Sequence, residues 1–329
     1  MGKTVSKKWI PILIEVVALF AITIPVTRLF CNTYLMSVIN SSLIYFIVVA
    51  GMTVMAGYGG MISMCSISFM GLSGFICTQL TKTYGMPSWF GIIAGTIGGT
   101  LFAVFVGALL LKLEGAYFIF GTLAIVYITF TIFNNYAPLT GANQGIAKVP
   151  DLNLFGIVFD DYYSWYVLLL IVAIAVIWLA LRIKKTYLGR ALMAVKGDKV
   201  AATTLGINVY RTKIIGFAVG SSFAALAGAL YPLHYNAISY AAFSANVELK
   251  IVIMAMLGGV QSVFGAIIGT FIVNALPELL RFMQGYINLL YGVILVLLMV
   301  FMPEGLAGLG NKLFSKARKR DRNAGEEKN

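Results

Sequence analysis

Long apolar stretches recur along this chain and are separated by short polar segments. A helix needs about 20 mostly apolar residues to cross the hydrocarbon core of a bilayer. Stretches of that length are predicted at residues 9–27, 37–57, 61–81, 89–111, 116–134, 164–181, 213–233 and 286–302. The pattern therefore predicts an all-α polytopic membrane protein whose surroundings are a lipid bilayer.

A further apolar stretch, residues 247–278, is interrupted by the sequence "GGVQSVFG", Gly258 to Gly265. Irregular backbone at membrane depth is tolerated only where protein buries it or where it lines a cavity, and in transporters such breaks point to the binding site. We expect a broken-helix hinge at Gly258, Gly259 and Gly265. Two crossings, or a re-entrant hairpin followed by a helix, both remain open for this stretch.

The basic residues predict the orientation. The chain carries 24 Lys and Arg against 12 Asp and Glu, and most of the basic ones lie before the first predicted span, between 182 and 213, or beyond 312. Cytoplasmic loops are enriched in Lys and Arg. If the N-terminus is cytoplasmic, six crossings return the chain to the cytoplasm at Arg182. We expect about ten transmembrane helices, both termini in the cytoplasm, one membrane domain (1–311) with a cytoplasmic loop (182–212), and a basic cytoplasmic tail (312–329).

Composition excludes several function classes. The chain is 60% hydrophobic and 11% charged, so its net charge of +12 indicates membrane topology rather than nucleic-acid binding. Three cysteines without C-x-x-C spacing and a single histidine, His234, predict neither a metal site nor a disulfide framework. No His-Glu-x-x-His motif and no Gly-x-x-x-x-Gly-Lys-Ser/Thr motif occurs. We expect no catalytic residue and no bound cofactor or metal.

The segment "GRALMAVKGDKVAATTLGIN", Gly189 to Asn208, is charged although long apolar spans flank it. Each charge would cost roughly 2.5–3.5 kcal/mol at the membrane centre, so the segment stays outside the bilayer. Its residues favour helix, and Gly197-Asp198 reads as a helix stop followed by an N-cap. A single continuous helix would instead gather one small apolar face, made of Ala191, Ala194, Val195, Ala201, Ala202 and Leu205. An ordinary basic loop and a docking surface for a soluble partner both stay open.

This segment resembles the cytoplasmic loop of the branched-chain amino acid permeases of ABC importers, the M-type subunit. The family pattern runs approximately G-R-A-x-x-A-[IV]-x-x-[ND]-E-x-A-A-x-x-x-G-I, and Lys199 stands where Glu is frequent. The stretches "YFIFGTLAIVYITFTIFNN" with "LTGANQGI", "VELKIVIMAMLGGVQSVFGAIIGT" and "LLYGVILVLLMVFMPEGLAGL" are similar to the family's fifth span and outer loop, broken helix and final span.

The resemblance implies an ABC importer permease fold in a bacterial-type plasma membrane. It implies a second, homologous but non-identical permease subunit, two cytoplasmic ATPase subunits that use the ATP, and an external substrate-binding protein. The cargo would be branched-chain or related hydrophobic amino acids, although similar permeases move urea or short amides. The resemblance also assigns ATPase coupling to Gly189, Arg190, Ala191, Ala194, Val195, Asp198, Lys199, Ala201, Ala202 and Gly206.

Polar residues inside predicted spans are the candidates for the substrate path. They are Ser63, Ser66, Ser68, Thr122, Thr129, Asn134, Glu248 and Asn274. Hydroxyls in membrane helices commonly bond to their own helix, so a structural role stays open for them. Glu248 is a functional candidate because ionisable residues at membrane depth are rare. It could instead lie at the outer interface with Lys250 by snorkelling.

An ion-gradient-driven secondary transporter is the rival from another class. Such a protein is expected to carry ionisable residues deep in several spans. Glu15 is the only acidic residue well inside a predicted span, which disfavours this alternative.

Overall fold

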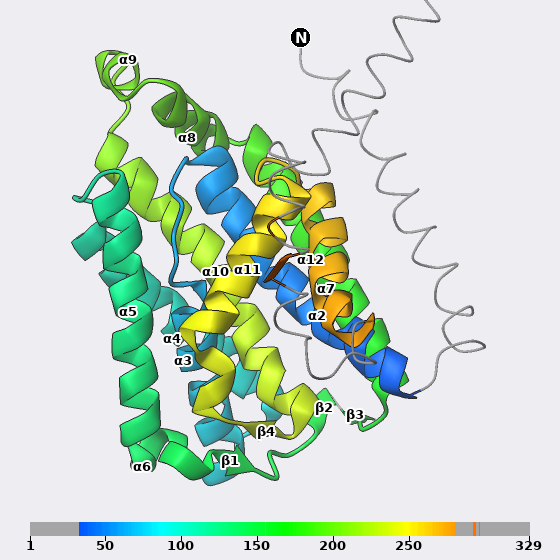
Figure 1. The fold of residues 1–329 in the computed structure, drawn as a ribbon. Coiled ribbons are helices and arrows are strands. Elements are labelled where there is room, and N and C mark those ends of the chain that lie inside the picture. Colours follow the sequence, from blue (N-terminus) through cyan, green and yellow to red (C-terminus); the bar gives the residue numbers. More distant parts are fainter. Residues whose placement is uncertain (1–32, 155, 280–291, 294–295, 297–329) are drawn as a thin grey trace, which may run out of the picture.

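A computed structural model describes residues 33–154, 156–279, 292–293 and 296. The predicted first span, Glu15 and the basic tail lie outside the described residues, as does most of the last predicted span. The described part is a helical bundle. One end, which we call the loop end, carries α8 and α9, and the opposite end, the strand end, carries the short strands (Figure 1).

The α-helices of the described residues are numbered in chain order. They are α2 (Thr33–Met52), α3 (Ser66–Thr78), α4 (Ser88–Leu110), α5 (Ala116–Asn135), α6 (Ala137–Thr140), α7 (Tyr162–Lys185), α8 (Tyr187–Gly197), α9 (Lys199–Thr204), α10 (Val209–Tyr235), α11 (Ala245–Gly258) and α12 (Val263–Leu279). The π-helical turns η2 (Thr53–Tyr58) and η3 (Gln79–Thr83) continue α2 and α3, and short 3-10 turns are η4 (Ala142–Gln144) and η5 (Tyr240–Phe243).

Two small antiparallel sheets close the strand end. β1 (Ile146–Ala147) pairs with β4 (Ala237–Ile238), and β2 (Leu152–Leu154) pairs with β3 (Ile157–Phe159). Because β4 directly follows α10, its pairing with β1 ties the connection after α6 to the end of α10. The long connections at this end are thereby held against the bundle.

Five helices among the described residues are long and apolar enough to cross a membrane. They are Thr33–Tyr58, Ser88–Leu110, Ala116–Asn135, Tyr162–Lys185 and Val209–Tyr235. These match five of the predicted spans and confirm a mostly helical, polytopic architecture. The count of about ten crossings remains a prediction, because the first span and most of the last lie outside the described residues.

The predicted span at 61–81 is wrong in its first part. Residues 59–65 are irregular, and α3 begins only at Ser66. The segment leaves the π-helical turn η2 at the loop end and runs back into the bundle before α3 starts (Figure 1). Its apolar residues, including Met61 and Ile62, hid this break from a hydropathy pattern.

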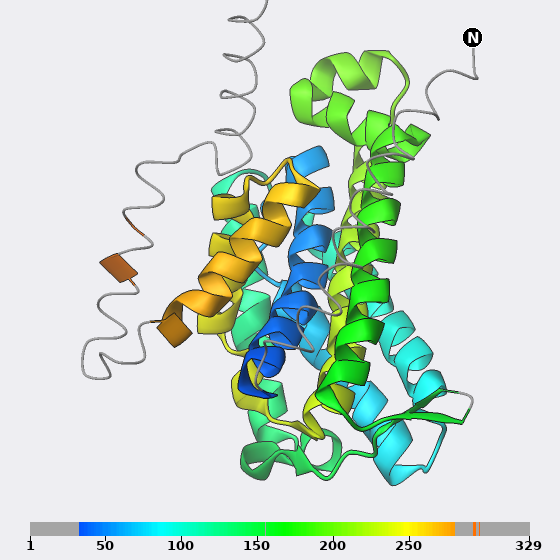
Figure 2. The same ribbon diagram turned by 90° about the vertical axis from the view of Figure 1, so that its right-hand side faces the viewer.

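The predicted break at 258–265 is confirmed. α11 ends at Gly258, α12 begins at Val263, and the two helices pack against each other (Figure 2). Gly259 has a positive φ of 93°, and a Cβ on Gly258 would collide with the backbone oxygen of Gly265. The segment is therefore a tight turn between two closely packed helices rather than one long span.

The turn η2, which leads into the first break, contacts the second break at the loop end. A Cβ on Gly57, in η2, would collide with the backbone oxygen of Val260, in the turn between α11 and α12. Non-helical backbone is thus collected at one place inside the protein, where neighbouring chain can cover it.

The centre of the bundle depends on close backbone approach between helices. A Cβ on Gly228, in α10, would collide with the backbone oxygen of Met70, in α3. Hydrophobicity gives helices no drive to associate in lipid, so contacts of this kind supply the packing energy. Gly197, at the end of α8, has open space where a Cβ would lie.

We expect Gly228→Ala to lower the unfolding free energy by about 1–3 kcal/mol, because the added methyl group must push two backbones apart. Gly197→Ala is the matched control and should leave stability unchanged. Thermal unfolding of the detergent-purified chain measures both. Equal melting temperatures for the two variants would contradict this account of the packing.

Candidate functional site

A carboxylate caps a helix inside the bundle. α3 begins at Ser66, and the N–H of Ile67 donates to Glu248 Oε2 at 2.7 Å. The N–H of Ser66 also donates to this carboxylate. The first N–H groups of a helix lack partners within the helix, and the helix dipole favours a negative charge there. Glu248 is 0% exposed, so it is neither snorkelling nor at an interface; it joins α11 to the start of α3.

Hydroxyl groups complete the polar environment around this helix start. Thr122 Oγ1 accepts from the N–H of Met64 at 3.0 Å, which satisfies the irregular backbone before α3. The hydroxyl groups of Ser68 and Thr129 are hydrogen-bonded at 2.8 Å. α5 therefore faces the segment 59–68 with its polar side.

Six of the eight predicted path residues lie together in this region. They are Ser63, Ser66, Ser68, Thr122, Thr129 and Glu248, all buried, and we call them the polar row. Within the described residues, Ser66 Oγ and Glu248 Oε1 are buried and have no hydrogen-bond partner. One hydroxyl group and one carboxylate oxygen of the row therefore take part in no hydrogen bond within the described residues.

The other two predicted path residues lie elsewhere. Asn274, in α12, accepts from Lys250 Nζ at 2.7 Å and donates to the Ser41 and Ser42 hydroxyl groups, each at 2.9 Å. Asn134 lies near the far end of α5. Lys250 therefore points toward α12 and α2 rather than snorkelling away from the bundle.

The charged loop forms two short helices, as the Gly197-Asp198 step predicts. α8 ends at Gly197, and Asp198 Oδ1 accepts from the N–H groups of Val200 at 2.8 Å and Ala201 at 3.1 Å. Asp198 is thus the N-cap of α9. The loop is ordered and projects beyond the ends of the long helices (Figure 1).

The single apolar face that one continuous helix would gather does not form. Ala191, Val195 and Ala202 are buried against the rest of the chain, whereas Val200 is 74% exposed and Leu205 is 78% exposed. The sharp joint at Asp198 turns α9 relative to α8, so one continuous face never forms. The small residues hold the loop to the bundle, and Val200 and Leu205 point away from it.

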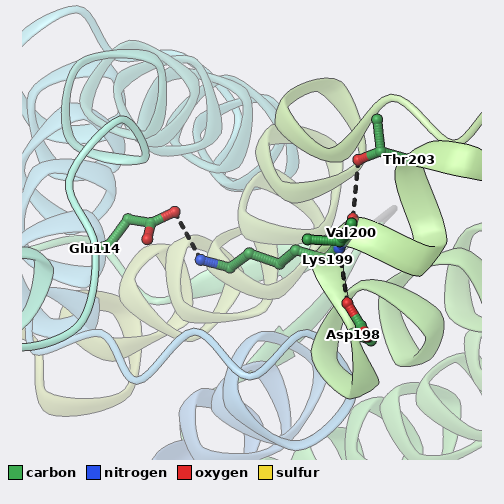
Figure 3. A network of polar contacts seen from close by, with 5 residues as sticks. All are labelled: Glu114, Asp198, Lys199, Val200 and Thr203. Carbon is green, nitrogen blue, oxygen red and sulfur yellow. Dashed lines mark hydrogen bonds and ion pairs between the residues drawn. The ribbon is translucent and has the colours of Figure 1, made fainter.

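Lys199 has a partner within the chain. Its Nζ lies 2.7 Å from Glu114 Oε1, in the turn between α4 and α5 (Figure 3). The hydrogen bond and charge of Lys199 hold the pKa of the Glu114 carboxyl below its usual value. Both side chains are largely solvated, which limits the strength of the pair. The lysine at a position where the family pattern often has Glu is therefore matched by an acidic residue on another element.

Lys196 connects α8 with η2 at the point where η2 contacts the turn between α11 and α12. Its Nζ donates to the backbone oxygen of Gly57 at 2.7 Å, and its stem packs on Gly60. Burial lowers the pKa of the Lys196 ammonium. Leu192, one turn earlier, packs against Gly216 of α10. No sequence motif marks this contact, because its acceptor is a backbone oxygen.

These features define a class of protein. Long apolar helices surround two breaks in the helical backbone and a buried row of polar side chains, an arrangement typical of membrane transport proteins. A family model described as "Branched-chain amino acid transport system / permease component" matches residues 34–303. The chain belongs to that family.

Individual relatives agree with the family match. The high-affinity branched-chain amino acid transport system permease protein LivM of Escherichia coli is 27% identical over 293 residues, covering 80% of this chain and 68% of the relative. The LivH permease protein of Salmonella typhimurium is 27% identical, covering 80% of this chain and 91% of the relative. The probable LivM protein of Methanocaldococcus jannaschii is 25% identical, covering 75% and 80%. No solved structure matches the chain.

The comparisons confirm the family resemblance that the loop and span motifs indicate. All of these relatives are named transport permeases. The chain is accordingly a multi-pass membrane transport component and not an enzyme, as predicted.

The cap at α3 gives a test of the Glu248 geometry. Glu248→Ala leaves buried N–H groups without an acceptor and should lower the unfolding free energy by about 1–3 kcal/mol. Glu248→Gln keeps a side-chain oxygen that can accept the same bond, so it should retain most of the stability. Thermal unfolding in detergent compares the two. If the glutamine variant is as unstable as the alanine variant, the negative charge, and not the hydrogen bond, holds α3.

Proposed function

We propose that this chain is the transmembrane permease subunit of an ATP-driven ABC importer for branched-chain or related hydrophobic amino acids. An external binding protein delivers the substrate, and separate subunits hydrolyse ATP. The observation that carries the proposal is the ordered two-helix loop, α8 and α9, which presents Val200 and Leu205 to solvent beyond the bundle of a family member.

Exposed apolar residues at the tip of a short, ordered element suit docking on a soluble partner. The proposed coupling residues then divide into two groups. Gly189, Ala191, Val195 and Ala202 pack inward and attach the loop, whereas Arg190, Ala201 and Gly206 lie on the solvent side with Val200 and Leu205. Lys199 points to Glu114 on the α4–α5 turn. Ala194 is half-buried between the two groups, and Asp198 sets the angle between the helices.

A contact chain supports transmission of movement from the loop to the bundle. Lys196 in α8 bonds to Gly57, and Gly57 abuts Val260 in the turn between α11 and α12. Movement of α8 by an ATPase subunit would displace both breaks together. We propose the hinge at Gly258, Gly259 and Gly265 as the element that responds.

The proposed orientation and partners follow from the same comparison. The loop end faces the cytoplasm of a cell with a bacterial-type plasma membrane, and both termini lie there. The chain is similar to both LivM and LivH permease proteins, which supports a core of two homologous, non-identical permeases. Two ATPase subunits and one external binding protein complete the importer, and this chain itself binds no cofactor.

The substrate path is proposed to run along the polar row. A zwitterionic amino acid that passes α3 would meet the Ser66 hydroxyl group and Glu248 Oε1, the two polar atoms there without partners in the described part of the chain. A permease for urea or short amides stays the alternative on the same scaffold. The family and the relatives are described as branched-chain amino acid permeases, which favours amino acids.

The secondary-transporter alternative is disfavoured by the family match and not, as expected from the sequence, by a scarcity of deep acidic residues. Glu248 is fully buried, so the predicted scarcity of deep acidic residues is not a sound argument. The match of residues 34–303 to a transport-system permease family disfavours a secondary transporter instead. Glu248 is moreover already engaged as the cap of α3.

The docking surface can be tested with a double variant. Val200→Glu with Leu205→Glu places two charges on the exposed tip, which should abolish co-purification of the ATPase subunits and binding-protein-dependent leucine uptake. The fold should persist, because both side chains are exposed. Tyr84→Glu changes a 70% exposed residue that follows η3 at the opposite, strand end; it is the control for an added charge and should leave co-purification of the ATPase subunits unchanged. Normal uptake by the double variant would exclude this surface as the docking site.

Transmission can be separated from docking at Lys196. Lys196→Met keeps the packing stem but removes the hydrogen bond to Gly57. We expect the ATPase subunits to remain bound and to hydrolyse ATP, while uptake per ATP falls several-fold. Lys185→Met, on the last turn of α7, provides a control for the loss of a basic charge. An unchanged ratio of uptake to hydrolysis would rule out Lys196 as the link.

A further inference from the structure

A cavity of about 350 Å³ opens at the loop end, beside the polar row. Three regions line it: the irregular segment 59–62, the turn between α4 and α5 with the start of α5, and the α8–α9 region together with Lys213 of α10. Small-molecule sites are commonly about 300–1,000 Å³, so its size suits one small ligand.

The charged groups of the cavity are unevenly paired. Lys196, Lys199, Lys213 and Glu114 line it. Lys199 pairs with Glu114, and Lys196 donates to the Gly57 backbone oxygen. Among the described residues, therefore, neither Lys196 nor Lys213 has an ion-pair partner. The cavity holds surplus positive charge next to one carboxylate.

The remaining wall is apolar. Met61 and Ile62 come from the irregular segment, and Leu111, Phe118 and Ile119 come from the ends of α4 and α5. A ligand here must combine an anionic group with an apolar part, and Glu114 offers an acceptor for a cationic group.

The cavity wall adjoins the polar row along two elements. Ile62, in the wall, directly precedes Ser63, and Ile119 lies one turn before Thr122 on α5. Thr122 Oγ1 donates to the backbone oxygen of Ile119 at 2.8 Å, so a hydrogen bond joins a row residue to a wall residue. This adjacency places the cavity at the loop end of the proposed path.

We infer that this cavity is a binding site for a free zwitterionic amino acid with a branched aliphatic side chain. Lys213 receives the carboxylate, Glu114 receives the ammonium group, and the side chain rests on Met61 and Ile119. This inference rests on the proposed function and adds a second substrate site to it, at the end where transported amino acid leaves.

The site also involves the coupling loop. Glu114 bonds to Lys199 of α9 (Figure 3). A ligand ammonium that takes Glu114 releases Lys199 from this pair. Occupancy by internal amino acid therefore changes how α9 is held, and transport should slow when internal substrate accumulates.

An anionic phospholipid headgroup is the competing occupant, because basic pockets near the cytoplasmic surface attract acidic lipids. Glu114 argues against it, since a carboxylate in the cavity repels a phosphate but attracts an ammonium group. The buried polar row that adjoins the cavity wall also argues against a lipid headgroup.

Binding to the detergent-purified full chain tests the inference. Isothermal titration with leucine should show saturable binding that Lys213→Ala and Glu114→Gln each weaken by about tenfold or more. The compound 4-methylpentanoate, which lacks the ammonium group, should bind more weakly than leucine and should be insensitive to Glu114→Gln. Lys112→Ala, in the same turn but not lining the cavity, is the control and should leave leucine affinity unchanged.

Two outcomes would overturn the inference: leucine binding that neither variant weakens, or titration with phosphatidylglycerol, but not leucine, that depends on Lys213. Its failure can be told apart from failure of the proposed function by assaying uptake in the reconstituted importer. ATP-dependent leucine uptake without a Lys213-dependent leucine site would exclude the cavity as an amino acid site and leave the proposed function intact. Absence of any amino acid uptake by the complete importer sinks the proposed function itself.

Discussion

The arrangement of this protein depends on a carboxylate that satisfies helix N–H groups far from either end of the bundle. α3 starts inside the bundle, away from water, where unpaired backbone N–H groups would cost several kcal/mol each. Glu248 accepts from the first turn of α3, and Thr122 accepts from the backbone just before it. With these bonds in place, the chain can cross the bundle as an irregular segment and still be stable, which leaves polar atoms at depth.

The same break explains why the loop and the interior are connected. Because α2 ends in a π-helical turn and does not continue into α3, the Gly57 backbone oxygen is available to Lys196. The turn between α11 and α12 packs on the same glycine. A short helix outside the bundle, the end of η2 and the turn between α11 and α12 therefore meet at one small junction.

Sequence patterns predicted the features that are local in the chain. Apolar length located five long helices, glycines located the turn after α11, and Gly197-Asp198 located the joint between α8 and α9. The features that were missed depend on distant partners. Glu248 caps a helix 181 residues away in sequence, and Lys196 bonds to a backbone oxygen, which has no residue signature. The break at 59–65 was hidden because buried irregular backbone can be as apolar as a helix.

The ion pair between Lys199 and Glu114 has a consequence for how this chain relates to its family. Where the loop pattern has Glu at the position of Lys199, the same geometry would set two carboxylates against each other unless the turn after α4 also changed. Lys199 and Glu114 are therefore matched to each other in this chain. A chimera that brings Glu to the position of Lys199 and keeps Glu114 would place two carboxylates against each other, and α9 would lose its ion pair with the α4–α5 turn.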